Sequence, residues 1–166
     1  MDSIDHKIIL ALKENGRRKA SDISHEIHLS VSSVIERILK LEASGIIQAY
    51  TIIMDDAKIG NDLTVLMEVS LEHPRFSDPF VRYVRTNPHI ISCYYLTGEF
   101  DYMLKICCHS SRELEEIHRE IKQQEGVRLT KTHYVLSTEK NNYSSMPDFE
   151  EENEMVSSVS GSRGQV

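Results

Sequence analysis

Residues 20–50 contain the feature that most restricts the fold of this chain, two short amphipathic helices separated by a tight turn. In the second predicted helix, Val34, Ile38 and Leu41 are spaced at i, i+4 and i+7, so their side chains share one face. The helix before it has its own isoleucine pair to pack against that face. Because Ser24 is small, the two helices can cross closely. The pattern predicts a helix-turn-helix.

The opposite face of the second helix is polar, and its residues are our candidate DNA contacts. Small hydroxyls near the start of a helix, followed by charged groups, suit insertion into the major groove of DNA. The candidates are Ser30, Ser32, Ser33, Glu36, Arg37 and Lys40. Two amphipathic helices joined by a turn also occur in helical domains that do not bind DNA, so the residues that follow are needed to decide.

The segment after the second helix supports a DNA-binding domain. Gly45 stands where a left-handed residue would end the helix, and an apolar pair follows it. Residues 48–53 then predict a β-strand. Together with a first helix over residues 2–14, these elements predict a winged-type helix-turn-helix domain at residues 1–54.

From residue 62 the hydrophobic pattern changes to the alternation of a β-strand, which continues to about residue 71. A helix, two strands, a second helix and a last strand are predicted after it. We place them at residues 78–86, 89–97, 100–108, 110–126 and 127–138. The order βαββαβ is that of a ferredoxin-like domain, so the predicted fold class is α+β.

Both helices of this second domain have expected starts. Ser77 is the predicted N-cap of the first helix. Ser110 and Glu113 have the spacing of a capping box at the start of the second. Helix boundaries at these residues are therefore expected.

Helices would cover one face of the predicted sheet and leave the other face open in a monomer. An exposed apolar face of this size favours coverage by another subunit. We therefore predict a homodimer formed through residues 62–138, with further assembly of dimers left open. The open face would carry Tyr94 or Tyr95, Met103 or Tyr102, and Val135 or Tyr134.

The net charge of −7 is unusual for a DNA-binding protein. Residues 1–50 hold seven Lys and Arg against seven Asp and Glu, so one copy would attract phosphate only weakly. Two copies acting together would bind better, which again favours a dimer. The cationic loop at residues 17–19 is either a phosphate contact or a solvated turn.

Two segments lack the pattern of a packed core. Residues 55–61 form a polar linker between the two domains. Residues 139–166 are rich in serine and acidic groups, and we predict a disordered tail there.

No catalytic, cofactor or metal motif is evident, and we predict that the chain is not an enzyme. Phosphate loops, GxSxG and HExxH are absent, and Glu115 with His118 is a weak metal motif. Cys107 and Cys108 would point to opposite faces of a strand. There is no apolar run near 18 residues and no secretory pattern at the start, so we expect no membrane contact and a cytoplasmic location with reduced cysteines.

Several residues and segments match the pattern of one known family, namely Asp5, Ser30-Val31-Ser32-Ser33-Val34, Arg37-Ile38, Leu41-Glu42, Gly45-Ile46-Ile47, Tyr50 and Thr97-Gly98-Glu99-Phe100-Asp101-Tyr102. On these residues the chain resembles the Lrp/AsnC (feast/famine) transcription regulators over about residues 1–138. It departs from the family at His28, where glycine is usual, and at Ser24, where alanine is usual. A positive φ at a non-glycine residue costs only roughly 1 kcal/mol, and histidine is among the residues that tolerate it best. We therefore expect the turn to be kept at His28.

The resemblance implies a sequence-specific regulator that binds double-stranded DNA and responds to a small metabolite, an amino acid, held near the glycine turn. The candidate ligand contacts are Gly98, Glu99 and Asp101. Backbone N–H groups at Gly98 can bind a carboxylate, and Asp101 can meet an ammonium group. Alternatively, Gly98 only permits a positive φ and Asp101 caps the turn. The alternative function is an architectural protein that compacts DNA with little sequence preference.

Overall fold

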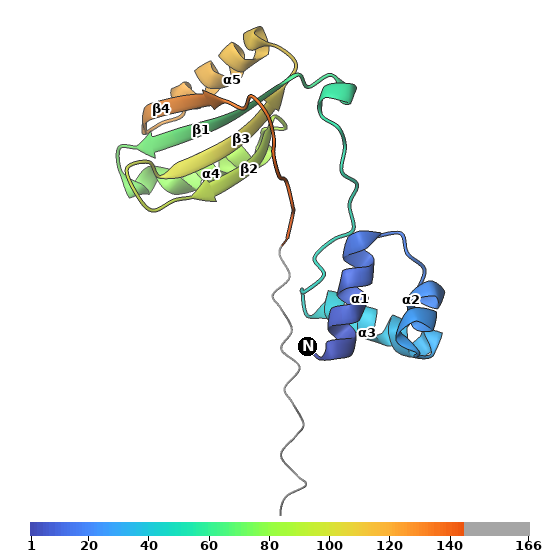
Figure 1. The fold of residues 1–166 in the computed structure, drawn as a ribbon. Helices are drawn as coiled ribbons and strands as arrows, with labels where there is room; N and C mark the ends of the chain where they lie inside the picture. Colours follow the sequence, from blue (N-terminus) through green and yellow to red (C-terminus); the bar gives the residue numbers. More distant parts are fainter. Residues whose placement is uncertain (145–166) are drawn as a thin grey trace, which may run out of the picture. The chain divides into compact units, whose positions relative to one another are not determined.

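The structure, a computed structural model, describes residues 1–144 and contains two compact units. One comprises Met1–Ile52 and the other Ile53–Asn141 (Figure 1). Residues 139–144 form no helix or strand, and the rest of the predicted tail lies outside the described residues.

The N-terminal unit consists of the helices α1 (Ser3–Glu14), α2 (Ala20–Ile27) and α3 (Val31–Ala43). Ser30 caps α3 because its hydroxyl accepts a hydrogen bond from the backbone N–H of Ser33 at 3.1 Å. All three helices contribute to one small core, which confirms the predicted helix packing. Its buried members are Ile8, Ala11, Ile23, Val34 and Leu41.

The turn between α2 and α3 keeps its left-handed residue without a glycine. His28 has a φ of 57°, and its backbone N–H bonds to the carbonyl of Ser24. Ser24 is buried, and its hydroxyl donates to the carbonyl of Ser21 at 2.7 Å. The Ser24 hydroxyl thus has a hydrogen-bond partner although it is buried. The small side chain fits between the helices, as the sequence predicted.

The prediction of a β-strand at residues 48–53 is wrong, because the structure has no strand there. Gly45 ends α3 with a φ of 74°, but the backbone that follows forms no ladder. Ile52 and Ile53 are 77% and 69% exposed. A strand needs a neighbour to accept and donate its backbone hydrogen bonds, and no segment within residues 1–144 supplies one.

The C-terminal unit has the predicted βαββαβ order. Its four antiparallel strands lie in the order β2-β3-β1-β4, so β2 and β4 form the edges. A short 3-10 turn at Ala57–Ile59 precedes the sheet, within the predicted linker. The elements are β1 (Leu63–Leu71), α4 (Ser77–Thr86), β2 (Ile90–Tyr95), β3 (Tyr102–Cys108), α5 (Ser111–Gln123) and β4 (Val127–Tyr134).

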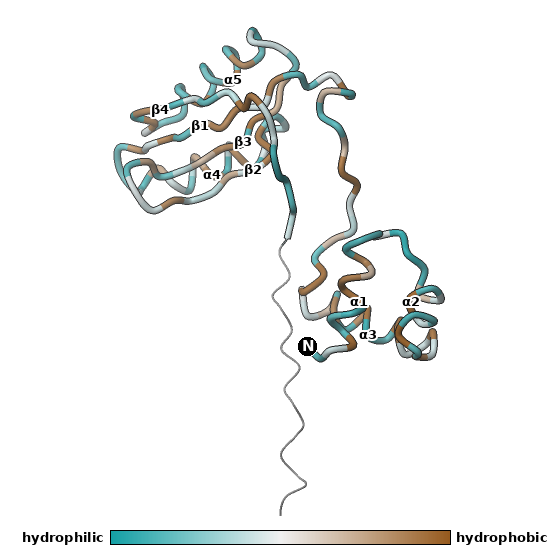
Figure 2. The backbone as a smooth tube through the Cα atoms, in the orientation of Figure 1, coloured by the Kyte–Doolittle hydropathy of each residue, from teal (hydrophilic) through white to brown (hydrophobic). Residues whose placement is uncertain are grey.

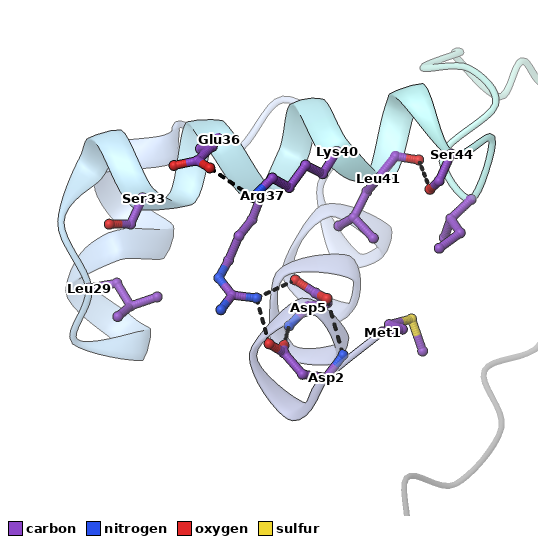
Figure 3. A pocket seen from close by; sticks show the side chains of 11 residues that line it. Met1, Asp2, Asp5, Leu29, Ser33, Glu36, Arg37, Lys40, Leu41 and Ser44 are labelled. Atoms are coloured by element: carbon purple, nitrogen blue, oxygen red, sulfur yellow. Dashed lines mark hydrogen bonds and ion pairs between the residues drawn. The ribbon is translucent and has the colours of Figure 1, made fainter.

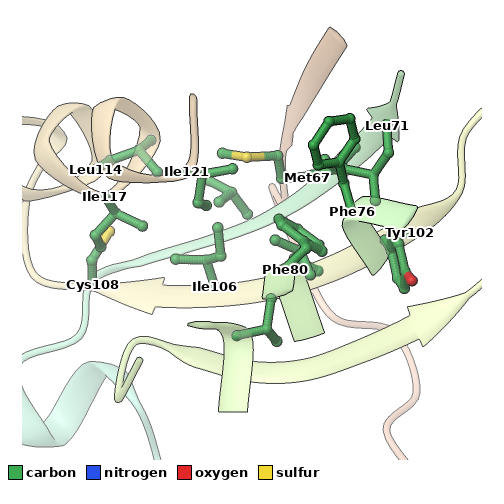
Figure 4. Close-up of a cluster of buried hydrophobic side chains, with 14 residues drawn as sticks. Met67, Leu71, Phe76, Phe80, Tyr102, Ile106, Cys108, Leu114, Ile117 and Ile121 are labelled. Atoms are coloured by element: carbon green, nitrogen blue, oxygen red, sulfur yellow. The ribbon is translucent and has the colours of Figure 1, made fainter. Parts of the chain in front are cut away.

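Both helices pack on the same face of the sheet, over a core of alternating strand residues (Figure 4). Val65, Met67 and Val69 of β1 are fully buried there, which confirms the predicted alternation. In Figure 2, α5 is mostly teal, because only its stripe of Leu114, Ile117 and Ile121 enters the core. Cys108 lies in this core and Cys107 on the other side of β3, as expected.

The two helix starts differ from the prediction in detail. Ser77 is the first residue of α4 and not its N-cap, because a 3-10 turn at Pro74–Phe76 leads directly into the helix. Ser110 caps α5 as predicted. The capping box is incomplete, however, since the Glu113 carboxylate accepts a hydrogen bond from the backbone N–H of His109 instead of Ser110.

The open face of the sheet mixes apolar and charged side chains. Tyr94 pairs with Met103 on this face, while Tyr102 is buried on the helix side. The Glu68 carboxylate accepts a hydrogen bond of 3.2 Å from the His133 ring and lies 3.8 Å from the Lys131 ammonium group. The face is therefore more polar than the sequence predicted.

Candidate nucleic-acid interface and effector turn

The predicted DNA-contact residues lie along one side of α3, beginning with three hydroxyls. The Ser30 hydroxyl lies 3.0 Å from that of Ser32 and 2.7 Å from that of Ser33. Ser30 and Ser32 are exposed, and Ser33 is half-buried. The start of α3 thus presents a cluster of small donors and acceptors held by the helix cap.

One turn further, two charged residues of α3 form an exposed ion pair. The Lys40 ammonium group lies 2.8 Å from the Glu36 carboxylate, and the two side chains are 73% and 68% exposed. The hydrogen bond from Lys40 lowers the pKa of the Glu36 carboxyl. Both groups face solvent and can contact a ligand together.

Arg37 is engaged within the protein, which the sequence did not indicate. Its Nη1 atom lies 2.7 Å from an oxygen of Asp2 and 2.7 Å from an oxygen of Asp5, at the start of α1 (Figure 3). These hydrogen bonds raise the pKa of the Arg37 guanidinium. The pKa of the Asp2 carboxyl is lowered, first by the backbone N–H of Asp5 and further by Arg37.

An open groove of about 660 Å³ lies between α3 and the start of α1. Four of the six predicted DNA contacts line it, and Ser30 and Ser32 are outside its lining. The four are Ser33, Glu36, Arg37 and Lys40.

α3 also exposes three apolar side chains that the sequence reasoning missed. Val31, Ile35 and Leu39 follow each other at intervals of four residues and are 42%, 46% and 57% exposed. Their helical spacing places them on a different face of α3 from the buried residues Val34 and Leu41. This spacing could have revealed the exposed apolar row from the sequence. Apolar side chains in the major groove can contact the methyl group of thymine.

Several cations of the N-terminal unit have no ion pair within residues 1–144. They are exposed, so they are available to phosphate groups. Of the cationic loop, Arg18 is paired with Glu14 and Glu26. The unpaired cations are Lys7, Lys13, Arg17 and Lys19.

The predicted effector residues lie in the turn between β2 and β3. Gly98 has a φ of 132°, and open space surrounds it on the side where a Cβ would stand. Glu99 is exposed. The Asp101 carboxylate accepts a hydrogen bond of 2.7 Å from the backbone N–H of Leu71, so this carboxylate ties the turn to β1.

Two further cavities lie within the C-terminal unit. One of about 380 Å³ lies between α4 and β2 and includes Arg85, Cys93 and Tyr95. The other, of about 240 Å³, lies between α5 and β4 and includes His118 and Tyr134. Both are alternatives to the turn as places for a small molecule.

Glu115 and His118, the two residues of the weak metal motif, contact other side chains. Glu115 forms an ion pair with Arg119 at 2.7 Å, and the His118 ring lies 3.1 Å from the Thr130 hydroxyl. Residues 1–144 contain no group of three or more His, Cys, Asp or Glu side chains suited to a metal ion. No helix in this part of the chain is long and apolar enough to cross a membrane.

Known proteins similar to this chain share both units. The AsnC-type helix-turn-helix domain model matches residues 1–42, and the Lrp/AsnC ligand binding domain model matches residues 64–145. The transcriptional regulator LrpC of Bacillus subtilis is 34% identical over 137 residues, which cover 82% of this chain and 92% of LrpC. The regulator FL11 of Pyrococcus horikoshii is 33% identical over 140 residues, covering 84% and 92% of the two chains.

Solved structures extend the similarity. A transcriptional regulator from Neisseria meningitidis in complex with L-methionine has a TM-score of 0.83 and 28% identity, covering 89% of this chain and 96% of that one. A feast or famine regulatory protein from M. tuberculosis, also complexed with L-methionine, has a TM-score of 0.82 and 27% identity, with coverages of 88% and 99%. This chain therefore belongs to the Lrp/AsnC family of transcription regulators, which is not an enzyme family.

Proposed function

We propose that this chain is a cytoplasmic regulator that binds specific DNA sequences as a homodimer and responds to an amino acid. The observation that carries the proposal is the row of exposed polar groups on α3, within a helix-turn-helix unit. The serine hydroxyls at its start and the Glu36–Lys40 pair offer donors and acceptors to base edges. Arg37 lies beside them, held by Asp2 and Asp5.

The phosphate contacts come from the unpaired cations. Arg17 and Lys19 lie in the loop before α2, and both are exposed. Phosphate contacts position a protein on the duplex, whereas base contacts determine sequence preference. The cationic loop and α3 therefore have separate tasks in this proposal.

In this proposal the effector binds at the turn that contains Gly98. Two structural relatives were solved in complex with L-methionine, which supports an amino acid as the class of ligand. The absence of a side chain at Gly98 lets a small ligand approach the backbone. Glu99 is exposed and can meet the ligand's ammonium group, while Asp101 contributes chiefly by fixing the turn.

The dimer is supported by the apolar groups that a single chain leaves exposed. On the open sheet face, Tyr94 is 59% and Leu129 is 48% exposed. Residues 50–54 add four exposed large apolar or aromatic side chains that a second copy would cover, namely Tyr50, Ile52, Ile53 and Met54. Light scattering at micromolar concentration tests this, and a stable monomer would contradict it.

Selection from a random duplex library followed by anisotropy titration tests the DNA proposal. We expect the selected duplex to bind at least about 10³ times more tightly than random duplex at the same salt concentration. Lys40→Ala should weaken this binding, whereas the matched control Lys58→Ala, in the other unit, should not. Equal affinity for selected and random duplex would favour the architectural function instead.

Calorimetry with the twenty amino acids, in the absence of DNA, tests the effector proposal. A ligand shifts an assembly only through different affinities for its states, so wild-type protein must bind it directly. Gly98→Val should abolish that binding. Gly60→Val is the matched control, because Gly60 also has a positive φ and open space around it. Wild-type protein that binds none of the twenty would refute the amino-acid response.

A further inference from the structure

We propose that Asp2 and Asp5 withhold Arg37 from DNA phosphate and so lower the affinity of this protein for random sequence. The inference rests on the proposed DNA-binding function and adds a residue-level account of its selectivity. It assigns Asp2 and Asp5 as positioning residues that act through Arg37.

The geometry of the three side chains carries the proposal. The guanidinium of Arg37 turns from α3 toward the start of α1, where one nitrogen contacts both carboxylates (Figure 3). Two negative groups thus face one positive group at the edge of the groove. A phosphate group that approaches the Nη1 atom of Arg37 would have to displace these carboxylates, and one that approaches elsewhere meets a guanidinium whose positive charge they offset.

The carboxylates are themselves held in place by the cap of α1. One oxygen of Asp2 accepts the backbone N–H of Asp5 at 2.8 Å, and one oxygen of Asp5 accepts the backbone N–H of Asp2 at 3.1 Å. The remaining oxygen of each side chain holds Arg37. The capping box therefore presents both free oxygens to the guanidinium in a fixed arrangement.

Arg37 remains within reach of solvent, because its side chain is 29% exposed and that of Asp2 is 52% exposed. The pair with Asp2 is exposed and therefore weak, and it opens at a cost of up to about fivefold in equilibrium constant, whereas Asp5, which is 17% exposed, holds Arg37 more firmly. A duplex that presents a guanine edge to Arg37 can offset this cost through two hydrogen bonds. Random sequence offers mainly phosphate, which competes less well.

The other cation of α3 is restrained in a similar way. Lys40 is paired with Glu36, so neither cation of this helix is without an ion pair in the described part of the chain. Phosphate attraction is independent of sequence. Holding both cations therefore disfavours unspecific binding, which is one route to specificity.

The test uses Asp2→Asn and Asp5→Asn in the full chain. Asparagine keeps the oxygen that caps the helix but loses the charge that holds Arg37. The matched control is Glu14→Gln in the same unit, because Glu14 is 81% exposed and Arg18 keeps its pair with Glu26. Random-sequence duplex is titrated over a series of KCl concentrations.

We expect each Asp variant to bind random duplex up to about fivefold more tightly than Glu14→Gln. The slope of log affinity against log salt should steepen by about 0.9, the value for one additional phosphate contact. The ratio of affinities for selected and random duplex should fall. In the double variant Asp5→Asn/Arg37→Ala, the gain should disappear.

Random-duplex affinity and salt slope equal to those of Glu14→Gln would overturn the proposal. An equal loss of affinity on selected and random duplex would also overturn it, because the cluster would then only brace α3 against α1. Wild-type protein that binds neither duplex would instead refute the proposed function.

Discussion

The carboxylate of Asp101 accepts a hydrogen bond from the backbone N–H of Leu71, the last residue of β1, at 2.7 Å. The pairing of β1 with β4 shifts register between Ser70 and Leu71. Asp101 therefore satisfies a backbone donor at the point where the strand pairing becomes irregular. The residue expected to bind an effector has a structural task in this arrangement.

Replacing Asp101 separates these two tasks. Asp101→Ala leaves the Leu71 N–H without its acceptor and should destabilise the C-terminal unit by about 1–3 kcal/mol. Asp101→Asn keeps a carbonyl oxygen and should cost less, while it removes the charge that an ammonium group would need. Urea unfolding and amino-acid calorimetry measure the two effects. Equal stability of the Ala and Asn variants would contradict the structural task.

His28 provides a prediction for the N-terminal unit. His28→Gly should stabilise this unit by up to about 1 kcal/mol, because glycine adopts a positive φ without steric cost. His25→Gly, inside α2, should destabilise it by about 0.5–1 kcal/mol. Thermal unfolding followed by circular dichroism compares the two variants. A destabilising effect at both positions would show that the turn carries no such strain.

Gly126 and Gly98 should respond differently to alanine although both have a positive φ. A Cβ at Gly126 would collide with the Phe76 side chain near its base, which cannot move away easily. Gly126→Ala should therefore destabilise the unit by about 2–4 kcal/mol. A Cβ at Gly98 would meet only open space, so Gly98→Ala should lower the free energy of unfolding by about 1 kcal/mol, through backbone strain alone. Urea unfolding of both variants measures the difference, and similar losses would argue against the clash.

The lowered pKa of the Glu113 carboxyl leads us to expect that the stability of the C-terminal unit depends on pH. This carboxyl has a pKa below the usual 4.5, first because the backbone N–H of His109 donates to it and then because the His109 and His89 rings lie nearby. A lowered pKa in the folded state stabilises the fold above about pH 4.5, and this stabilisation is lost as the pH falls through the lowered value. Thermal unfolding over a pH series should show a shallower acid loss for Glu113→Gln than for wild type. The control Glu116→Gln lies on the exposed side of the same helix and should keep the wild-type profile. Identical profiles for wild type and Glu113→Gln would exclude this contribution.

The architecture could be predicted because it depends on local periodicity. Alternating residues such as Val65, Met67 and Val69 indicated a strand with one buried face, and the structure buries all three. The strand at residues 48–53 was predicted from the same kind of local preference. It failed because strand formation also requires a paired neighbour, which local sequence does not specify.

The candidate site was predicted less completely, for a related reason. The helical spacing placed Ser33, Glu36 and Lys40 correctly on one side of α3, and their contact with DNA remains a prediction. The partners of Arg37 could not be predicted, because they are 32 and 35 residues away and meet it only after the helices pack. Ion pairs of this kind follow from tertiary structure.

All three cysteines of the sequence lie on β2 and β3, and residues 1–52 contain none. Cys107 and Cys108 are buried, and desolvation raises the pKa of the Cys93 and Cys108 thiols. Because the thiolate is the reactive form, a thiol reagent should modify the buried cysteines mainly when the sheet opens. The labelling rate of Cys107 and Cys108 then reports the opening of this unit alone, without an engineered probe. A bound effector that stabilises the unit would slow the labelling, which gives a binding assay that needs neither DNA nor knowledge of the target sequence.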